Sequence, residues 1–150
     1  MRPLAELKIT EYGPPATEEL IREFEQYIGR KLPEDYLLFL RQYGGGAPEI
    51  GDFRTRGGGC WGVCDFYSIG IERNSTMSLW WAYDVWSKVM GEHLVPIAFD
   101  GGGDQMALRY GDRPEPDVVV IVHEGYDVAE VADTFGEWID SLYIDDEDLV

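Results

Sequence analysis

The amino-acid sequence predicts a single α+β domain in which a mostly antiparallel sheet packs with about four helices. Three observations lead to this prediction. The 150 residues suit one core, and 45% of them are hydrophobic, too many for a disordered chain. Four segments show the helical spacing of apolar residues, and three strand-like runs follow one another in the second half. Because short turns separate these runs, neighbouring strands are expected to be antiparallel.

Two helices are predicted in the first third of the chain. Residues 1–16 end in a region with two consecutive prolines, which break a helix, so this segment is expected to be a short arm or an edge strand. Thr17 then suits the N-cap of a first helix that ends at Gly29. Pro33 suits the first turn of a second helix, which the glycines at 44–46 end. Because the connection is short, the two helices are expected to be neighbours that cover one side of the sheet.

The middle of the chain combines a glycine-rich stretch with a third predicted helix. Residues 44–60 are expected to form an ordered loop or an irregular hairpin, and residues 60–71 one or two strands. The third helix is predicted to follow N-caps at residues 74–76. Trp80 and Trp81 fall outside its apolar stripe, which leaves two interpretations: exposed anchors for a partner, or rings covered by a loop.

The second half of the chain predicts a meander and a closing helix. Residues 95–110 have the pattern of a hairpin around a glycine-rich turn, and the β-branched run at 118–122 is expected to be a central strand. Residues 128–132 add a short strand, and Thr-Phe-Gly-Glu at 134–137 is the capping box of a last helix. The acidic residues 144–150 are expected to form a solvated end of the single domain.

The charge balance restricts the class of partner. The chain has 12 basic and 29 acidic residues, a formal net charge of −17, which opposes binding to nucleic acid or to an anionic membrane and favours a basic protein. No stretch is long and apolar enough to suggest a membrane span or a leader, so the expected location is the cytoplasm. In that compartment Cys60 and Cys64 are expected to be reduced thiols, with a disulfide or metal role as the alternative.

Asp100 and Asp104 are the first candidates for a chemical site, because both present carboxylate oxygens from one turn. Two ligands are too few for a hard cation, although Glu124 or Asp127 could complete a set. The simpler interpretation is that the aspartates accept hydrogen bonds from backbone amides and shape the turn. His123 and Glu124 begin a zinc-protease motif that lacks its second histidine. The sequence therefore predicts no catalytic residue, metal or cofactor.

Several motifs occur in the order typical of one family. They are Phe24-Glu25 and Ile28-Gly29, Leu32-Pro33-Glu34-Asp35-Tyr36, Phe39-Leu40, Gly44-Gly45-Gly46-Ala47-Pro48, the run from Val95 to Asp104, His123-Glu124, and Phe135-Gly136-Glu137-Trp138-Ile139. In this order the chain resembles the SUKH superfamily, which includes bacterial immunity proteins and fungal regulators of cell-wall synthesis. The resemblance implies an α+β domain and, in bacteria, a protective partner of a secreted polymorphic toxin, often a nuclease.

The sequence and the resemblance together favour a binding protein over an enzyme. The expected function is immunity: the chain would bind a cognate toxin with a basic surface and block it sterically. The alternative is a non-catalytic regulatory domain with a housekeeping partner. Partner-binding candidates combine aromatic anchors with carboxylates that attract a basic surface, namely Phe53, Trp61, Trp80, Trp81, Tyr126, Asp100, Asp104, Glu124 and Asp127.

Overall fold

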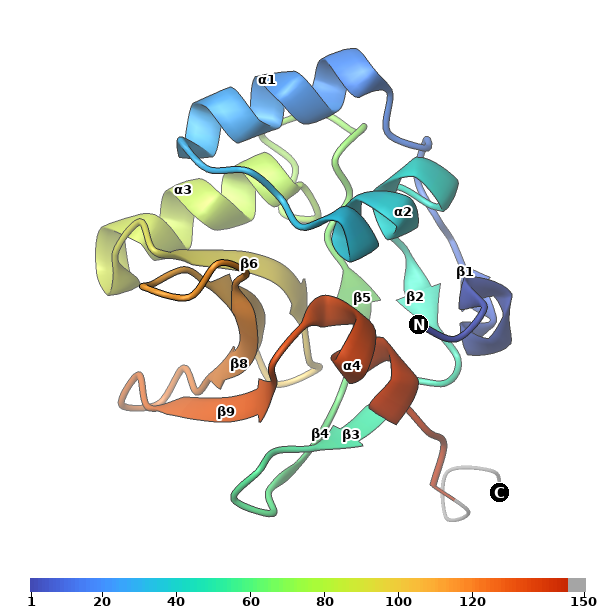
Figure 1. The fold of residues 1–150 in the computed structure, drawn as a ribbon, viewed down its shortest axis with the longest axis vertical. Coiled ribbons are helices and arrows are strands. Elements are labelled where there is room, and N and C mark those ends of the chain that lie inside the picture. Colours follow the sequence, from blue (N-terminus) through green and yellow to red (C-terminus); the bar gives the residue numbers. More distant parts are fainter. Residues whose placement is uncertain (146–150) are drawn as a thin grey trace.

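The structure, a computed structural model, describes residues 1–145 and confirms the predicted α+β class (Figure 1). The helices in these residues are the 3-10 turn η1 (Leu4–Leu7) and α1 (Glu18–Ile28), α2 (Glu34–Gln42), α3 (Leu79–Met90) and α4 (Phe135–Ser141). The strands are β1 (Ile9–Thr10), β2 (Ala47–Pro48), β3 (Asp52–Arg54), β4 (Cys60–Gly62), β5 (Asp65–Phe66), β6 (Leu94–Phe99), β7 (Gln105–Arg109), β8 (Asp117–Ile121) and β9 (Val128–Ala132).

Five strands form the main antiparallel sheet, in the order β5-β6-β7-β8-β9. The last four follow one another along the chain, so the predicted meander is confirmed. β8 is paired on both sides, but the middle strand is β7, one place from the expected centre. Val118 and Val120 of β8 face the main core, whereas Val119 and Ile121 face a smaller apolar cluster. Burial on both faces explains the uninterrupted β-branched run.

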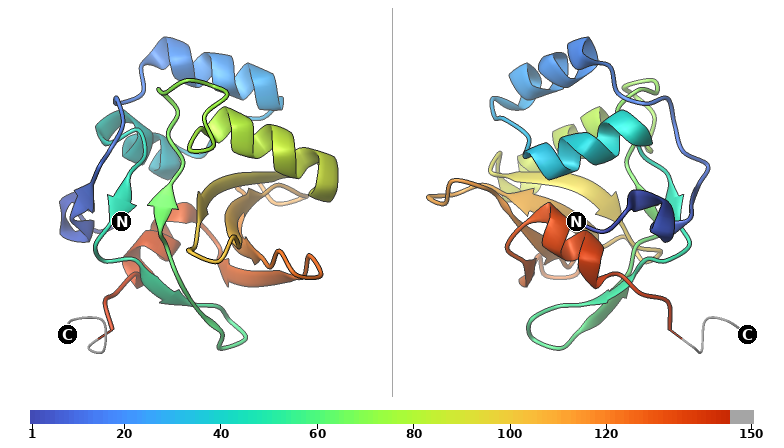
Figure 2. Two further views of the ribbon diagram at one scale, coloured as in Figure 1. Left: turned by 180° about the vertical axis from the view of Figure 1, so that it is seen from behind. Right: turned by 45° about the vertical axis from the view of Figure 1, so that its right-hand side comes forward.

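Helices cover both faces of this sheet. α4 packs against β8 and β9 and contacts α2, while α3 lies along β6. α1 lies over α2 and α3, so the first two helices close the same end of the molecule (Figures 1 and 2). Among residues 1–145, none of the helices has the length and apolar character needed to cross a membrane.

The segment before α1 is packed onto the domain. β1 pairs with β2, the backbone amides of Glu49 and Ile50 donate to the carbonyl of Leu7, and Leu4, Leu7 and Ile9 are buried. The expected edge strand is therefore present, but only as two residues. At the other end, residues 146–150 of the predicted acidic tail lie outside the described part of the chain.

Phe53 and Trp80, two of the predicted surface anchors, lie in the core, which corrects that prediction. Phe53 is fully buried in β3, with its ring 5.5 Å from that of Trp138. Trp80 is only 3% exposed; its indole nitrogen donates to the carbonyl of Ile69, and its ring centroid lies 5.0 Å from that of Phe24 in α1. The helical spacing did not predict this burial, because Trp80 packs against Phe24 and Tyr27 of α1, which covers a second face of α3.

The glycines that follow α2 are required by close backbone contacts. Gly44 has φ +72°, and a Cβ atom there would lie 2.0 Å from the carbonyl oxygen of Pro14. The same approach brings the amide of Ile69 to the carbonyl of Gly44. The glycine triplet thus lets the segment before α1 and the segment after β5 pack against each other.

We expect Gly44→Ala to destabilise the domain by about 3 kcal/mol, because the left-handed conformation and the steric clash add. Chemical denaturation of both proteins measures the change. Gly57→Ala is the matched control, since a Cβ atom at Gly57 meets no atom within 4 Å. Equal stability of the two variants would contradict the close approach at Gly44.

Candidate partner-binding surface

The turn between β6 and β7 is organised by Asp100. Its Oδ1 atom accepts hydrogen bonds from the backbone amides of Gly102, at 3.0 Å, and of Asp104, at 2.8 Å. The amide of Asp100 donates to the carbonyl of Asp104, which closes the turn. Asp100 therefore shapes the backbone, in agreement with the simpler interpretation of the sequence.

Asp104 connects three segments that are distant in the sequence. Its Oδ2 atom accepts from the indole nitrogen of Trp61 in β4, at 2.8 Å. Its Oδ1 atom accepts from the backbone amide of His123, at 3.0 Å, and also contacts the imidazole Nδ1 atom of that residue. A single carboxylate thus fixes β4, the β6–β7 turn and the segment after β8 at one end of the sheet.

The contact between Asp104 and His123 favours the charged form of each group. Partial burial raises the pKa of Asp104, but the hydrogen bonds from Trp61 and His123 outweigh it, so the net pKa lies below that of a free carboxyl. The hydrogen bond to Asp104 in turn raises the pKa of His123. An ion pair on the exposed edge of the sheet is the consequence.

This pair gives a signed pH dependence. The contribution of His123 to stability is present below its unfolded pKa of about 6.5 and is lost as the pH rises through the raised folded pKa. The contribution of Asp104 is present above about pH 3.9 and is lost as the pH falls through its lowered folded pKa. We therefore expect Asp104→Asn to lose more stability at about pH 5.5 than at about pH 8.5.

Denaturation curves at the two pH values test this expectation, and the imidazole titration followed by NMR should shift to lower pH in the variant. Asp127→Asn, an exposed aspartate a few residues from His123, is the matched control. The ion pair would be contradicted if both variants showed the same pH dependence.

The local chemistry does not assemble a nucleophile beside His123. The Nε2 atom of His123 lies 4.0 Å from a carboxylate oxygen of Glu124. Cys60 and Cys64 are both exposed, unpaired thiols. Although the residue is exposed overall, partial desolvation of its thiol and the hydrogen bond to Asp65 raise the pKa of Cys64, which favours the unreactive thiol form. Within residues 1–145, no three His, Cys, Asp or Glu side chains are grouped so that they could hold a metal ion.

An apolar groove of about 430 Å³ lies beside this cluster, between α3 and the β6–β7 end of the sheet. We call it the aromatic groove, and its lining residues are Tyr67, Thr76, Met77, Trp81, Val85, Trp86, Phe99 and Gln105. Gln105 joins the two features, because its amide nitrogen donates to the carbonyl of Gly103 in the turn and its amide oxygen accepts from the hydroxyl of Tyr67. Hydrogen bonds of Gln105 therefore link the groove to the turn that carries Asp104.

The structure brings most of the predicted partner-binding residues to this end of the sheet. Trp81 lines the groove, Trp61 and Asp104 belong to the hydrogen-bonded cluster, Asp100 organises the turn, and Glu124, Tyr126 and Asp127 follow His123. Sequence reasoning missed His123 as the partner of Asp104, because nothing local connects residues 19 positions apart. Trp86 was not among the predicted partner-binding residues, although it lines the groove as well as packing on the smaller apolar cluster.

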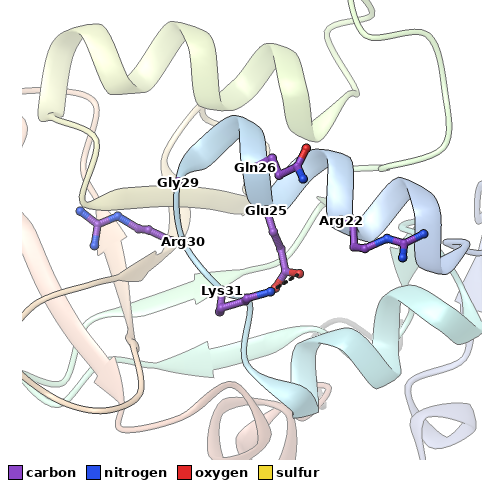
Figure 3. Close-up of a pocket in the computed structure, with 6 residues that line it drawn as sticks. All are labelled: Arg22, Glu25, Gln26, Gly29, Arg30 and Lys31. Carbon is purple, nitrogen blue, oxygen red and sulfur yellow. Dashed lines mark ion pairs between the residues drawn. The ribbon is translucent and has the colours of Figure 1, made fainter.

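Two other recesses are less suited to a defined ligand. The pocket at the end of α1 is lined by basic residues, but the side chains of Arg22 and Arg30 extend in opposite directions, and Lys31 is paired with Glu25 (Figure 3). These cations do not converge on an anion. A second groove, of about 410 Å³, runs past Trp61 and Asp100 and is lined by carboxylates. It extends the acidic character of the same end of the sheet.

Comparison with known proteins decides the family. A model of the SMI1/KNR4 family (SUKH-1) matches residues 15–141. The chain belongs to this family. It is also 27% identical, over 150 aligned residues, to the SPbeta prophage-derived uncharacterized protein YokK of Bacillus subtilis (strain 168), a match that covers 84% of this chain and 74% of that protein. The resemblance to the SUKH superfamily is thereby confirmed.

Two segments that carry the SUKH resemblance meet in the structure. Asp35, in the Leu-Pro-Glu-Asp-Tyr segment, accepts a hydrogen bond from the amide of Gly136 at the start of α4, at 2.7 Å. The ring of Tyr36 packs on Phe135, with centroids 5.0 Å apart. Residues about one hundred positions apart thus hold the second and last helices of the SUKH-1 domain together.

Proposed function

We propose that this chain is an immunity protein that binds one cognate toxin domain in the cytoplasm of the producing cell and blocks it without catalysis. The observation that carries the proposal is membership in the SUKH-1 family by a chain with a net charge of −17. Such a charge attracts a basic partner and opposes binding to phosphates directly. A nuclease fits this description best, because a protein that binds nucleic acid presents a basic groove.

Steric blocking follows from the same chemistry. Carboxylates placed over a basic groove occupy the positions that nucleic-acid phosphates would take, and apolar contacts then slow dissociation. The end of the sheet around Asp104 offers both elements, since exposed Glu124 and Asp127 lie beside the aromatic groove. Inhibition by occupation of the toxin's basic groove requires no nucleophile, metal or cofactor from the immunity protein.

Co-expression with the product of the gene adjacent to the one for this chain tests the function. We expect cells to survive expression of the toxin only when this chain is present, and we expect the two proteins to elute together from a size-exclusion column. Equal killing with and without this chain, together with separate elution, would contradict immunity and would favour the regulatory alternative.

Electrostatic steering gives a kinetic prediction. We expect the association rate with the toxin domain to fall about tenfold or more as the salt concentration rises from about 20 to about 200 mM, because exposed charges are screened beyond about 8–10 Å. Stopped-flow fluorescence measures this rate, and the dissociation rate should change much less. An association rate independent of salt would show that steering by the carboxylates plays no part.

A further inference from the structure

We propose that the toxin inserts an apolar side chain, flanked by lysine or arginine, into the aromatic groove between α3 and the β6–β7 end of the sheet. This inference deepens the proposed immunity function and rests on it, because it names the docking site and the chemistry of the segment that binds there. It is carried by the shape of the groove, by the conformation of Tyr126 and by the charges around both.

One side of the groove is formed by a third apolar face of α3, which no other element covers fully in the described residues. Trp80 and Tyr83 pack toward α1, and Trp86 and Met90 pack on the smaller cluster of the sheet. Trp81, Val85 and Val89 are spaced four residues apart, so they follow one another along the remaining side. Val85 is 38% exposed and Val89 is 50% exposed. An apolar stripe on a helix is normally covered, and in the described residues nothing covers this one fully.

Tyr126 extends the apolar surface across the segment after β8. Its ring lies 6.2 Å from that of Trp86 in an edge-to-face arrangement and is 49% exposed. Tyr126 has φ +58°, a left-handed conformation that costs a non-glycine residue about 1–2 kcal/mol. The chain thus holds a large aromatic side chain at the surface in a position that asparagine or glycine would occupy more easily.

The charges around the groove specify a basic partner. Glu124 and Asp127 flank Tyr126, and Asp100 in the β6–β7 turn adds a further carboxylate, whereas Asp84 of α3 accepts a hydrogen bond from Tyr27 on the α1 side. The nearby cations are Lys88 and the paired His123. A second copy of this chain would carry the same net charge of −17 and would be repelled, as would nucleic acid. An apolar residue between lysines or arginines complements both the groove and its rim.

The test measures binding of the toxin domain against which this chain protects cells in the co-expression experiment, with the catalytic residues of that toxin inactivated. In Val85→Lys a cation replaces an exposed apolar residue in the groove, and in Leu38→Lys the same change is made on α2, where Leu38 is 53% exposed and far from the groove. We expect Val85→Lys to raise the dissociation constant at least thirtyfold and Leu38→Lys to change it less than threefold. Thermal melts of both variants check that they fold.

Tyr126→Asn is a second test variant, and unlike Val85→Lys it introduces no charge into the apolar groove. Asparagine adopts the left-handed conformation readily, so the melting temperature should stay the same or rise, while loss of the ring should weaken toxin binding about tenfold or more. If the wild-type chain binds the toxin domain but all three variants bind it equally well, the docking site is wrong and the immunity function stands. If the wild-type chain does not bind the toxin domain at all, the docking site and the immunity function are both overturned.

Discussion

The position of α3 between α1 and the sheet is the constraint on which the rest of the structure depends. Its twelve residues include apolar side chains on nearly every side, so one partner cannot bury them. Trp80 and Tyr83 pack against α1, and Trp86 and Met90 pack against the sheet. Two partners placed on two sides fix the direction of the helix, and they leave the remaining stripe open next to the turns of the meander.

The distribution of ion pairs explains why one end of the sheet is acidic. Arg56, Arg109 and Arg113 pair with carboxylates of β8, β9 and the residue after β9, including the buried Asp117. These arginines are therefore engaged around β8 and β9, outside the β6–β7 turn. The exposed pairs among these add little stability, but all of the pairs neutralise local charge. The carboxylates around the β6–β7 turn have fewer such partners, and their field acts on solvent and on approaching molecules.

The parts of the fold that depend on local sequence could be predicted. The meander follows from β-branched runs with short turns, and α4 begins at Thr134 because its hydroxyl accepts from the amide of Glu137. The burial of Phe53 and Trp80 could not be predicted, because it depends on which helices cross α3 and β3. The hydrogen bonds that link Asp104 to Trp61 and His123 could not be predicted from the sequence either. Residue types suggested candidates that gather at one end of the sheet, and tertiary packing decided which of them reach the surface.

The candidate surface is built mainly from turns and from one helix face, whereas strands β6, β7 and β8 beneath it are almost entirely buried. Substitutions at Gly101, Gly102, Glu124 or Asp127 would change what a partner meets without creating a cavity in the core or straining a left-handed glycine. A domain arranged in this way can acquire a new specificity by a few surface changes while its folding energy stays nearly constant. This separation of recognition from stability would suit a protein whose binding partner changes in sequence over time.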